Sequence, residues 1–430
     1  MAPWGDQAIG GLSSHLASLE KVIAIIGQES IVSSHEAVPK RVQELCWFVS
    51  RIWPGSRLMA STTLIETLHG LLGLREALRG ETELVHAHEV MCLPAARWIA
   101  RFVGAPVVLT VHSQHTLEAI AAGSLRRGTR DARSAWRREK SAYRNADFVF
   151  TVTTPLRAFV LAEAGVDPAK VLVQLNFVDV EGFQPRDASE AREILNREGV
   201  PIDSSPGDGR RLVLYPGRLS PRKGVDYLIR AAQDVVGRDR RVHFLITGEG
   251  PQLAELMRLR SSLGLDESVT FLGNLPSGLV KYLYNVVDVV VLPSVTIEGV
   301  QEGTPMSALE AMASGVPLVC SAIGGLREIV SDGETGHLVP EKSPERLAEA
   351  ILRTLDEDQA AITSRARQYV REHRSLESYA KDLTTFLEGL GARPNSGHDR
   401  GEAARLKLRK QVGPSERSIM PGELGGRERR

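Results

Sequence analysis

Two glutamates and two basic residues are the strongest candidates for chemistry in this chain of 430 residues. Glu302 and Glu310 stand eight positions apart, around a Gly-Thr-Pro loop that leads into an expected helix. Arg218 and Lys223 follow an apolar run that is typical of a strand. Carboxylates accept hydrogen bonds from sugar hydroxyls, and fixed cations bind diphosphates. A pocket that holds both kinds of group suits a nucleotide-sugar.

The loop between the two glutamates fits the start of a helix. Pro305 is expected in the first helical turn, where its missing N–H is not needed. The unpaired N–H groups of such a turn can receive phosphate or sugar oxygens. The alternative is that one glutamate caps its own helix and the other lies on a solvated face. Arg218 and Lys223 would likewise fit an ordinary solvated loop, so spacing alone leaves both interpretations open.

Histidines follow or occupy two of the expected strands. His112 comes directly after the apolar run 106–111. Ligands bind at the carboxyl ends of strands in open α/β sheets, although a single histidine is more often structural. His86 and His88 alternate on a short strand and should share one face. Because no third ligand stands near them in the sequence, we do not expect a metal site there.

Composition indicates a globular protein of two domains. The length exceeds what one ordinary core fills, and 42% hydrophobic with 25% charged residues is an ordinary balance. A formal net charge of zero gives no general attraction to nucleic acid. Three widely spaced cysteines favour a reducing compartment. The chain start lacks signal-peptide features and no apolar run reaches membrane-spanning length, so we expect a cytoplasmic protein.

Short apolar strands alternate with helical patterns along most of the chain, which predicts parallel sheets covered on both faces. The strands are expected at 83–88, 106–111, 147–152, 211–215, 242–246, 269–272, 288–292 and 317–320. The helices are expected near 11–23, 64–78, 93–103, 131–145, from 155, 224–236, 251–263, 277–286, 305–314 and 325–330. We predict domains at 1–178 and 179–390, joined by a hinge at 176–185, and a disordered tail at 391–430.

An ordered series of motifs in the second half resembles the retaining glycosyltransferases of family 4, which have the GT-B fold. The series runs through residues 217–224, 248–251, 271–273, 288–294, 302–317, 324–328 and 333–336. As an ordered set it is far more specific than any one of its motifs. The first half matches more loosely, at 10–11, 85–88, 110–112 and 147–152. The fold that this implies is α/β, with two Rossmann-like, doubly wound domains facing each other across a cleft.

The resemblance also implies a role for each candidate. Arg218 and Lys223 would neutralise the donor diphosphate, Glu302 would bind the donor sugar, and His112 would lie near it. Glu310 would bind the ribose hydroxyls. The other donor-binding residues that it implies are Gly11 beneath the diphosphate, Phe271 and Gly273 beside the base, and Thr304, Pro305, Met306 and Ser307 around the sugar and phosphate.

The implied reaction moves a sugar from a nucleotide-diphosphate sugar to a glycan, lipid or small-molecule acceptor. Departure of the diphosphate leaves negative charge on it and oxocarbenium character on the sugar. The cations and the helix start would stabilise the leaving charge in a closed cleft. The family usually needs no divalent metal, which fits the missing Asp-x-Asp motif, so no metal or cofactor is expected.

Two departures from the family pattern favour alternatives. Only nine residues precede Gly10, so we expect either that the first strand is absent or that the true start lies upstream. The hinge has Phe177 where the family commonly has glycine, and Phe adopts positive φ less readily. A catalytically degenerate nucleotide-sugar-binding or scaffold protein is therefore the alternative function. Sugar-nucleotide epimerisation is a third, whereas hydride transfer is disfavoured because Gly248 to Gly250 lacks the later glycine of the dinucleotide fingerprint.

A basic run suggests a further contact. Eight cations crowd into a short stretch, at Arg126, Arg127, Arg130, Arg133, Arg137, Arg138, Lys140 and Arg144. They are suited to an anionic acceptor, such as a lipid phosphate at a membrane surface. The interspersed Asp131 and Glu139 also fit an ordinary solvated helix face, which is the competing interpretation.

Overall fold

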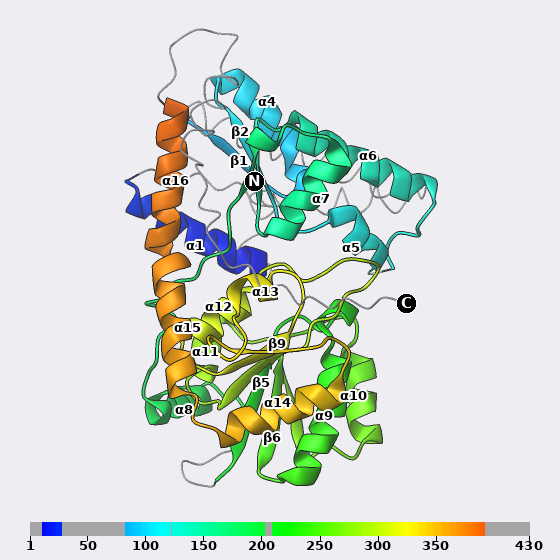
Figure 1. The fold of residues 1–430 in the computed structure, drawn as a ribbon, viewed down its shortest axis with the longest axis vertical. Coiled ribbons are helices and arrows are strands. Elements are labelled where there is room, and N and C mark those ends of the chain that lie inside the picture. Colours follow the sequence, from blue (N-terminus) through cyan, green and yellow to red (C-terminus); the bar gives the residue numbers. More distant parts are fainter. Residues whose placement is uncertain (1–10, 28–81, 122, 203–208, 392–430) are drawn as a thin grey trace, which may run out of the picture. The chain divides into compact units, whose positions relative to one another are not determined.

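The computed structural model describes residues 11–27, 82–121, 123–202 and 209–391 (Figure 1). Residues Met1–Asp382 belong to one compact unit, and Leu383–Arg430 to a second, of which the last turns of a helix are described. The expected absence of a first strand, the helix predicted at 64–78 and the tail beyond Gly391 all lie outside the described residues.

The first sheet has four described strands, all parallel, in the order β1-β2-β3-β4. They are β1 (Val85–His88), β2 (Val107–Val111), β3 (Phe148–Thr151) and β4 (Val171–Val173). Every residue of β2 and β3 is buried, which explains why these strands appear as continuous apolar runs rather than alternating ones. Three of these strands match predicted ones, and β4 was not predicted.

Helices of the first half follow the strands, as in other parallel sheets. They are α1 (Gly11–Ile25), η2 (Val90–Cys92), α4 (Leu93–Val103), α5 (His115–Ala121), α6 (Arg130–Asn145), α7 (Thr154–Ala164) and η3 (Pro168–Lys170). The side chains of Thr129 and Thr153 cap the amino ends of α6 and α7. One sheet face packs against α4, α6 and α7 through a core that includes Leu109 and Tyr143.

The second sheet has six parallel strands in the order β10-β9-β8-β5-β6-β7. They are β5 (Arg211–Pro216), β6 (Val242–Thr247), β7 (Val269–Gly273), β8 (Val289–Leu292), β9 (Leu318–Ser321) and β10 (His337–Val339). The order turns back between β5 and β8, so the loops leaving these neighbouring strands diverge there. This is the topological switch point at which ligands bind in such sheets.

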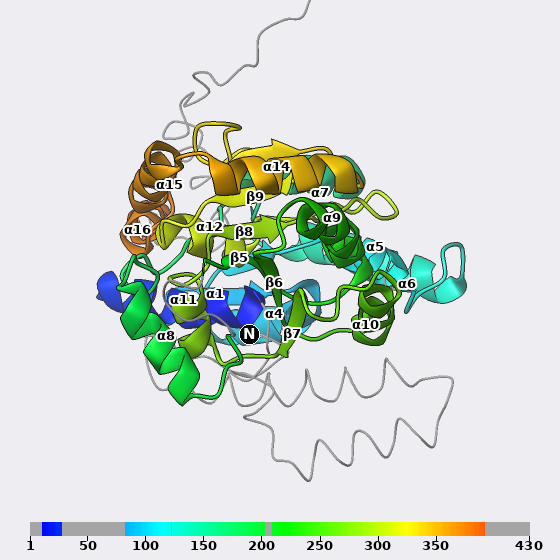
Figure 2. The ribbon, with the colours of Figure 1, turned by 90° about the horizontal axis from the view of Figure 1, so that it is seen from below.

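Helices cover both faces of the second sheet (Figure 2). They are α8 (Ala188–Arg197), η4 (Pro221–Lys223), α9 (Val225–Arg238), α10 (Leu253–Ser262), α11 (Ser277–Leu283), α12 (Met306–Ala313), α13 (Leu326–Ile329), α14 (Pro344–Asp356) and α15 (Ala360–His373), with α16 (Leu376–Gly391) following. Alternate residues of β5 separate the two cores. Leu212 and Leu214 pack with α8 and α12, while Val213 and Tyr215 pack with α9 and α14.

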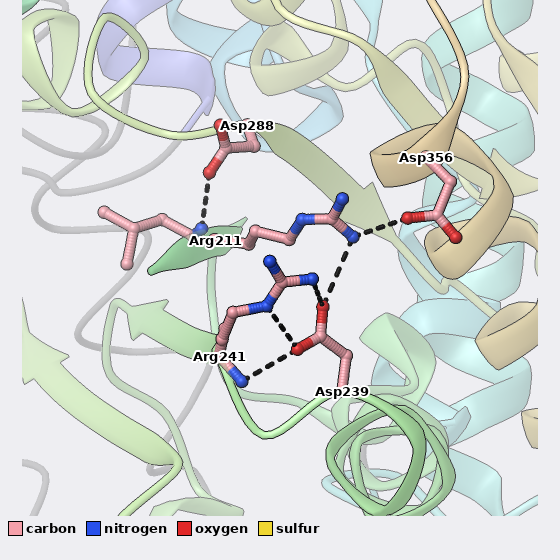
Figure 3. A network of polar contacts seen from close by, with 6 residues as sticks. Arg211, Asp239, Arg241, Asp288 and Asp356 are labelled. Carbon is pink, nitrogen blue, oxygen red and sulfur yellow. Dashed lines mark hydrogen bonds and ion pairs between the residues drawn. The ribbon is translucent and has the colours of Figure 1, made fainter. Parts of the chain in front are cut away.

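A polar network holds the amino-terminal end of the second sheet (Figure 3). Arg211 contacts Asp356 at 2.6 Å and Asp239 at 3.3 Å, and Arg241 also pairs with Asp239. The hydrogen bond from Arg241 lowers the pKa of Asp239 to about 2. Asp288 accepts the backbone N–H of Leu212, which ties β5 to the loop before β8. This network lies at the strand end opposite to the switch-point loops and is structural.

The hinge differs from the expected geometry. Phe177 does not take the left-handed conformation. The described non-glycine residues with positive φ are Glu89, Glu298 and Lys342. Its ring is 1% exposed and lies 3.9 Å from the Tyr379 ring, centroid to centroid. Phe177 thus avoids the positive φ that phenylalanine adopts less readily than glycine, and it is a core residue here.

Candidate functional site

An ion pair joins the two loops at the switch point. The ammonium of Lys223 lies 2.8 Å from Oε2 of Glu302, whose side chain is only 8% exposed. The hydroxyl of Ser294, directly after β8, donates to the same oxygen at 3.1 Å. Both contacts use Oε2, so the geometry leaves Oε1 of Glu302 for another donor.

Nearby cations hold Glu302 in its charged form. Burial alone would raise the pKa of this carboxyl, but Lys223 and then Arg222 oppose burial and lower the pKa below its usual value. Glu302 therefore remains a carboxylate at neutral pH, able to accept hydrogen bonds from hydroxyl groups.

Two glycines allow the loops to approach each other. Gly224, at φ 64°, lies so close to the Pro293 carbonyl that an added Cβ would be 2.1 Å from the oxygen. Gly324, at φ 46°, lies as close to the carbonyl of Glu302. That carbonyl also accepts the N–H of Gly325 at 3.0 Å. A side chain at position 224 would displace the Pro293 backbone, and one at position 324 would displace the backbone of Glu302.

Arg218 takes a different position from Lys223. Its side chain is exposed in the loop after β5 and forms no ion pair with any residue that the structure describes. Its carbonyl accepts the Tyr215 hydroxyl at 2.9 Å, which fixes the backbone and leaves the guanidinium turned to solvent. Of the two predicted cations, the structure therefore brings only Lys223 to Glu302.

The start of α12 presents backbone donors beside this pair. Pro305 is the residue before the helix rather than within its first turn, a small correction to the prediction. The N–H groups of Met306 and Ser307 have no acceptor among the described residues. The carbonyl of Thr304 accepts the side-chain amide of Asn176 at 2.8 Å. Because Asn176 belongs to the hinge, this bond fixes the loop from outside and keeps the helix start open.

Glu310 is buried within α12, away from any cation. The Tyr284 hydroxyl donates to its Oε2 at 2.8 Å, and its side chain makes no ion pair with a described residue. Burial raises the pKa of Glu310 to about 7, although the Tyr284 hydrogen bond opposes the shift. A carboxyl with this pKa is half-ionised near neutral pH, and hydroxyl donors from a ligand would favour its charged form.

His112 belongs to a row of histidines on the first sheet. Its Nε2 lies 3.3 Å from Nδ1 of His88, and Nε2 of His86 lies 2.6 Å from the Thr110 hydroxyl. His86 and His88 share a face, as predicted, with ring centroids 4.1 Å apart. Burial lowers the pKa of His112 to about 4, so it is neutral at pH 7. No group of three ligands among the described residues is arranged to hold a metal ion.

A cavity of about 60 Å³ lies between these parts of the two halves. His112, Ser113 and Gln114 line it from the first half, with Thr153, Pro155 and Leu156. The second half contributes Gly299, Val300, Gln301, Glu302, Gly303 and Gly324. The cavity thus joins two residues singled out from the sequence, His112 and Glu302, which are far apart along the chain.

The remaining predicted residues have mixed surroundings. Phe271 is partly buried against the core, and the guanidinium carbon of Arg260 lies 5.8 Å from the centre of its ring. Gly273 ends β7 with φ 66° and its carbonyl accepts the N–H of Gly248. Gly11 is the first residue of α1, a helix that contacts α12.

Three site residues were missed from the sequence. Arg222 directly precedes Lys223 in the same basic segment, so its position beside a predicted cation was an available signal. Ser294 follows the end of β8, so its position at a strand's carboxyl end was an available signal. Tyr284 follows α11 and nothing in its local sequence indicates that it reaches Glu310.

Comparisons with known proteins identify the protein family to which the chain is similar. Residues 200–373 match "Glycosyl transferases group 1", and residues 9–181 match "Glycosyltransferase Family 4". The chain is similar to the alpha-D-kanosaminyltransferase of Streptomyces kanamyceticus, with 32% identity over 66% of this chain and 71% of that one. It is 31% identical to a D-inositol 3-phosphate glycosyltransferase of Corynebacterium urealyticum, over 73% of each chain.

Solved structures show the same architecture. The HepE protein of Anabaena, determined with UDP and glucose, superposes with a TM-score of 0.61 at 20% identity, covering 74% of this chain and 81% of that one. The fold is therefore GT-B, with two Rossmann-like domains. The protein is a glycosyltransferase and belongs to the group 1, family 4 glycosyltransferases.

Proposed function

We propose that this enzyme transfers a sugar, with retention of anomeric configuration, from a nucleotide-diphosphate sugar to a hydroxyl group of an acceptor. The observation that carries the proposal is the Lys223–Glu302 pair at the switch point, beside the open start of α12. A cation and free N–H groups suit the diphosphate, and a carboxylate suits the sugar hydroxyls. Retention rests on the resemblance to the family.

The geometry supports an exchange of partners when the donor binds. Lys223, with Arg218 from solvent, would turn to the diphosphate, and Glu302 would accept a sugar hydroxyl in place of the Lys223 ammonium. Ser294 would keep Oε2 in position during this exchange. His112, neutral and on the opposite wall of the cavity, would hydrogen-bond the sugar.

The reaction breaks the bond between the anomeric carbon and the diphosphate oxygen. A new bond forms from the acceptor oxygen to the same face of that carbon, and the acceptor proton passes to the departing phosphate. The cations and the N–H groups of Met306 and Ser307 stabilise the charge that develops on the phosphate. In this proposal neither glutamate is a nucleophile and, following the resemblance to the family, no metal or cofactor takes part.

We expect residues of the first half of the chain to select the acceptor. We propose a hydroxylated glycan, lipid or small molecule, because the cavity wall at His112 to Gln114 is polar. The names of two relatives refer to different molecules, a kanosaminyl group and D-inositol 3-phosphate, so the fold alone does not identify the acceptor.

A thermal-shift screen tests the donor class. UDP, GDP, ADP and their sugar conjugates would be added to the wild type and to an Arg218→Ala/Lys223→Ala variant. One nucleotide at a hundredfold excess over its Kd should stabilise the wild type by about 2.7 kcal/mol, and the variant should lose the shift. UDP is the first to test because HepE was determined with it.

The same screen, followed by activity assays, distinguishes the proposed transferase from the alternative functions. If no nucleotide shifts the wild type, the donor assignment fails and a catalytically degenerate scaffold becomes the better account. If nucleotide binds but a nucleotide-sugar is neither hydrolysed nor transferred, the protein is a binding module. An isomerised sugar on the recovered donor would indicate epimerisation instead.

We propose that the outer face of α6 contacts an anionic surface. In the basic run, Lys140 pairs with Glu163, Arg127 pairs with Glu298, and Arg144 donates to the Ala164 carbonyl. Arg133, Arg137 and Arg138 donate to groups of α6 itself or of the turn before it. Arg126, Arg130, Arg133, Arg137 and Arg138 remain exposed. No helix among the residues that the structure describes has the length and apolar character to cross a bilayer.

Co-sedimentation with liposomes tests the α6 face. Binding should rise when phosphatidylglycerol is added to phosphatidylcholine vesicles and should fall steeply with salt, because each cation near the surface contributes about 1 kcal/mol. An Arg137→Glu/Arg138→Glu variant should lose most of it, whereas the matched control Arg238→Glu/Arg240→Glu should not. Equal binding to neutral and anionic vesicles would contradict the proposal.

A further inference from the structure

A chain of polar contacts crosses from the first half to the second. Ser113 donates to Oε2 of Glu118 on α5 at 2.8 Å, and the other oxygen of Glu118 pairs with the Arg222 guanidinium. Arg222 in turn donates to the carbonyl of Gln301 at 3.1 Å. Four residues from two loops and a helix are thus joined in one line.

The two ends of this line stand next to the candidate site residues. Ser113 follows His112, and Gln301 precedes Glu302. Ser113 and Gln301 both line the cavity, one from each half of the chain. The line therefore spans the cavity beside the groups that would hold the donor sugar, and its length sets how far apart they lie.

The ion pair between Arg222 and Glu118 is better placed to set this separation than to bind phosphate. The Arg222 and Glu118 side chains are 22% and 30% exposed, and both ends of the guanidinium are engaged. Arg218, by contrast, is exposed and has no ion pair among the described residues. Loss of the Glu118 carboxylate would free Arg222 and Ser113 together, which would loosen both walls of the cavity.

We infer that Glu118 and Arg222 are positioning residues, which hold the His112 wall at a fixed distance from the Glu302 wall. They act as one unit through Ser113 and Gln301 and do not touch the donor. The catalytic consequence rests on the proposed function, whereas the coupling between the two walls does not.

Amide hydrogen exchange tests the coupling without any ligand. Glu118→Gln, Arg222→Gln and the double variant would be compared with the wild type over residues 112–121 and 297–303. Each single variant should speed exchange in both segments, and the double variant should match the singles, because each change breaks the same unit. Acceleration confined to the mutated side, or additive effects, would overturn the inference.

The Arg127–Glu298 pair provides a matched control. It also joins the two halves, at 3.0 Å, but its side chains are 65% and 50% exposed. Exposed pairs contribute little, so Arg127→Gln and Glu298→Gln should leave exchange in both segments as in the wild type. A control that loosens both segments equally would show that any cross-contact has this effect, and would also overturn the inference.

A second arm separates positioning from phosphate binding. The Kd for UDP should stay within about twofold in Glu118→Gln, Arg222→Gln and the double variant, while UDP release from UDP-glucose falls about tenfold in all three. An Arg222→Gln variant that loses UDP affinity while Glu118→Gln keeps it would make Arg222 a phosphate ligand and overturn the inference. If the wild type does not bind UDP, only the choice of UDP as the nucleotide is wrong. The exchange measurement would still decide whether the two walls of the cavity are coupled.

Discussion

Replacement of Lys223 by methionine is expected to weaken UDP binding roughly 10–100-fold, because a charge-assisted contact contributes about 1.5–3 kcal/mol. It should also destabilise the free protein by about 2–3 kcal/mol, since Glu302 would remain charged and buried without its partner. Isothermal titration with UDP and chemical denaturation would measure the two effects separately.

The stability loss should depend on pH in a defined direction. Lys223 and Arg222 hold the pKa of Glu302 below its unfolded value, so the pair stabilises the protein above that unfolded value. The contribution disappears as the pH falls through the folded pKa and Glu302 is protonated. The difference in stability between the wild type and Lys223→Met should therefore be largest near neutral pH and should vanish in acid.

A double variant distinguishes the two functions of Lys223. Adding Glu302→Gln to Lys223→Met removes the unpaired charge and should recover most of the lost stability. UDP affinity should not recover, because the cation is still missing. If Lys223→Met retained full UDP affinity, the diphosphate would have to bind elsewhere and the proposed donor site would be wrong.

The fold was predictable from sequence where local patterns decide it. Buried strands such as Val107–Val111 and Val289–Leu292 are continuous apolar runs, and parallel sheets require such runs. The strands β4 and β10 were missed because each has only three residues, too few for a periodic signal. Helix α11 ends at Leu283, earlier than the 286 predicted, with the chain turning at Tyr284.

The site was predictable only in part, because its contacts join distant residues. Lys223 and Glu302 were both singled out, yet their direct pairing follows from the crossover between β5 and β8. The partners Tyr284 and Glu118 carry no local signal, since a tyrosine just after a helix and a glutamate within one are both ordinary. Phe177 shows a similar limit: its position in the hinge indicated a change of backbone geometry, but not that its ring packs against Tyr379.

Two of the cations at the candidate site are paired with carboxylates of the protein. Lys223 pairs with Glu302, and Arg222 pairs with Glu118, whereas Arg218 is exposed. At the proposed donor site, a diphosphate would compete with Glu302 for Lys223, and the competition would release a carboxylate beside the proposed sugar site. Donor binding and release of Glu302 would then be a single event, so the donor affinity should depend on the strength of the pair.

Replacement of Glu310 by glutamine is expected to stabilise the free protein while weakening nucleotide binding. Burial raises the pKa of Glu310 from 4.5 to about 7. Between these values the unfolded chain releases the proton while the folded protein retains it, so wild-type stability falls as the pH rises through this range. The loss amounts to about 3 kcal/mol above pH 7, at 1.36 kcal/mol per pKa unit, and Glu310→Gln should not show it.

Denaturation curves at pH 5, 6, 7 and 8 would measure this difference, with Tyr284→Phe as the companion variant. The Tyr284 hydroxyl lowers the pKa of Glu310, so its removal should raise that pKa and extend the fall in stability to higher pH. UDP should bind Glu310→Gln about tenfold more weakly at pH 8, because a neutral amide accepts ribose hydroxyls less strongly than a carboxylate. Equal stability of Glu310→Gln and wild type at pH 8 would mean that the carboxylate is solvated in the fold. Unchanged UDP affinity would instead mean that Glu310 does not bind the ribose. A buried carboxyl that lowers the stability of the protein and binds no ligand would have no function at that site.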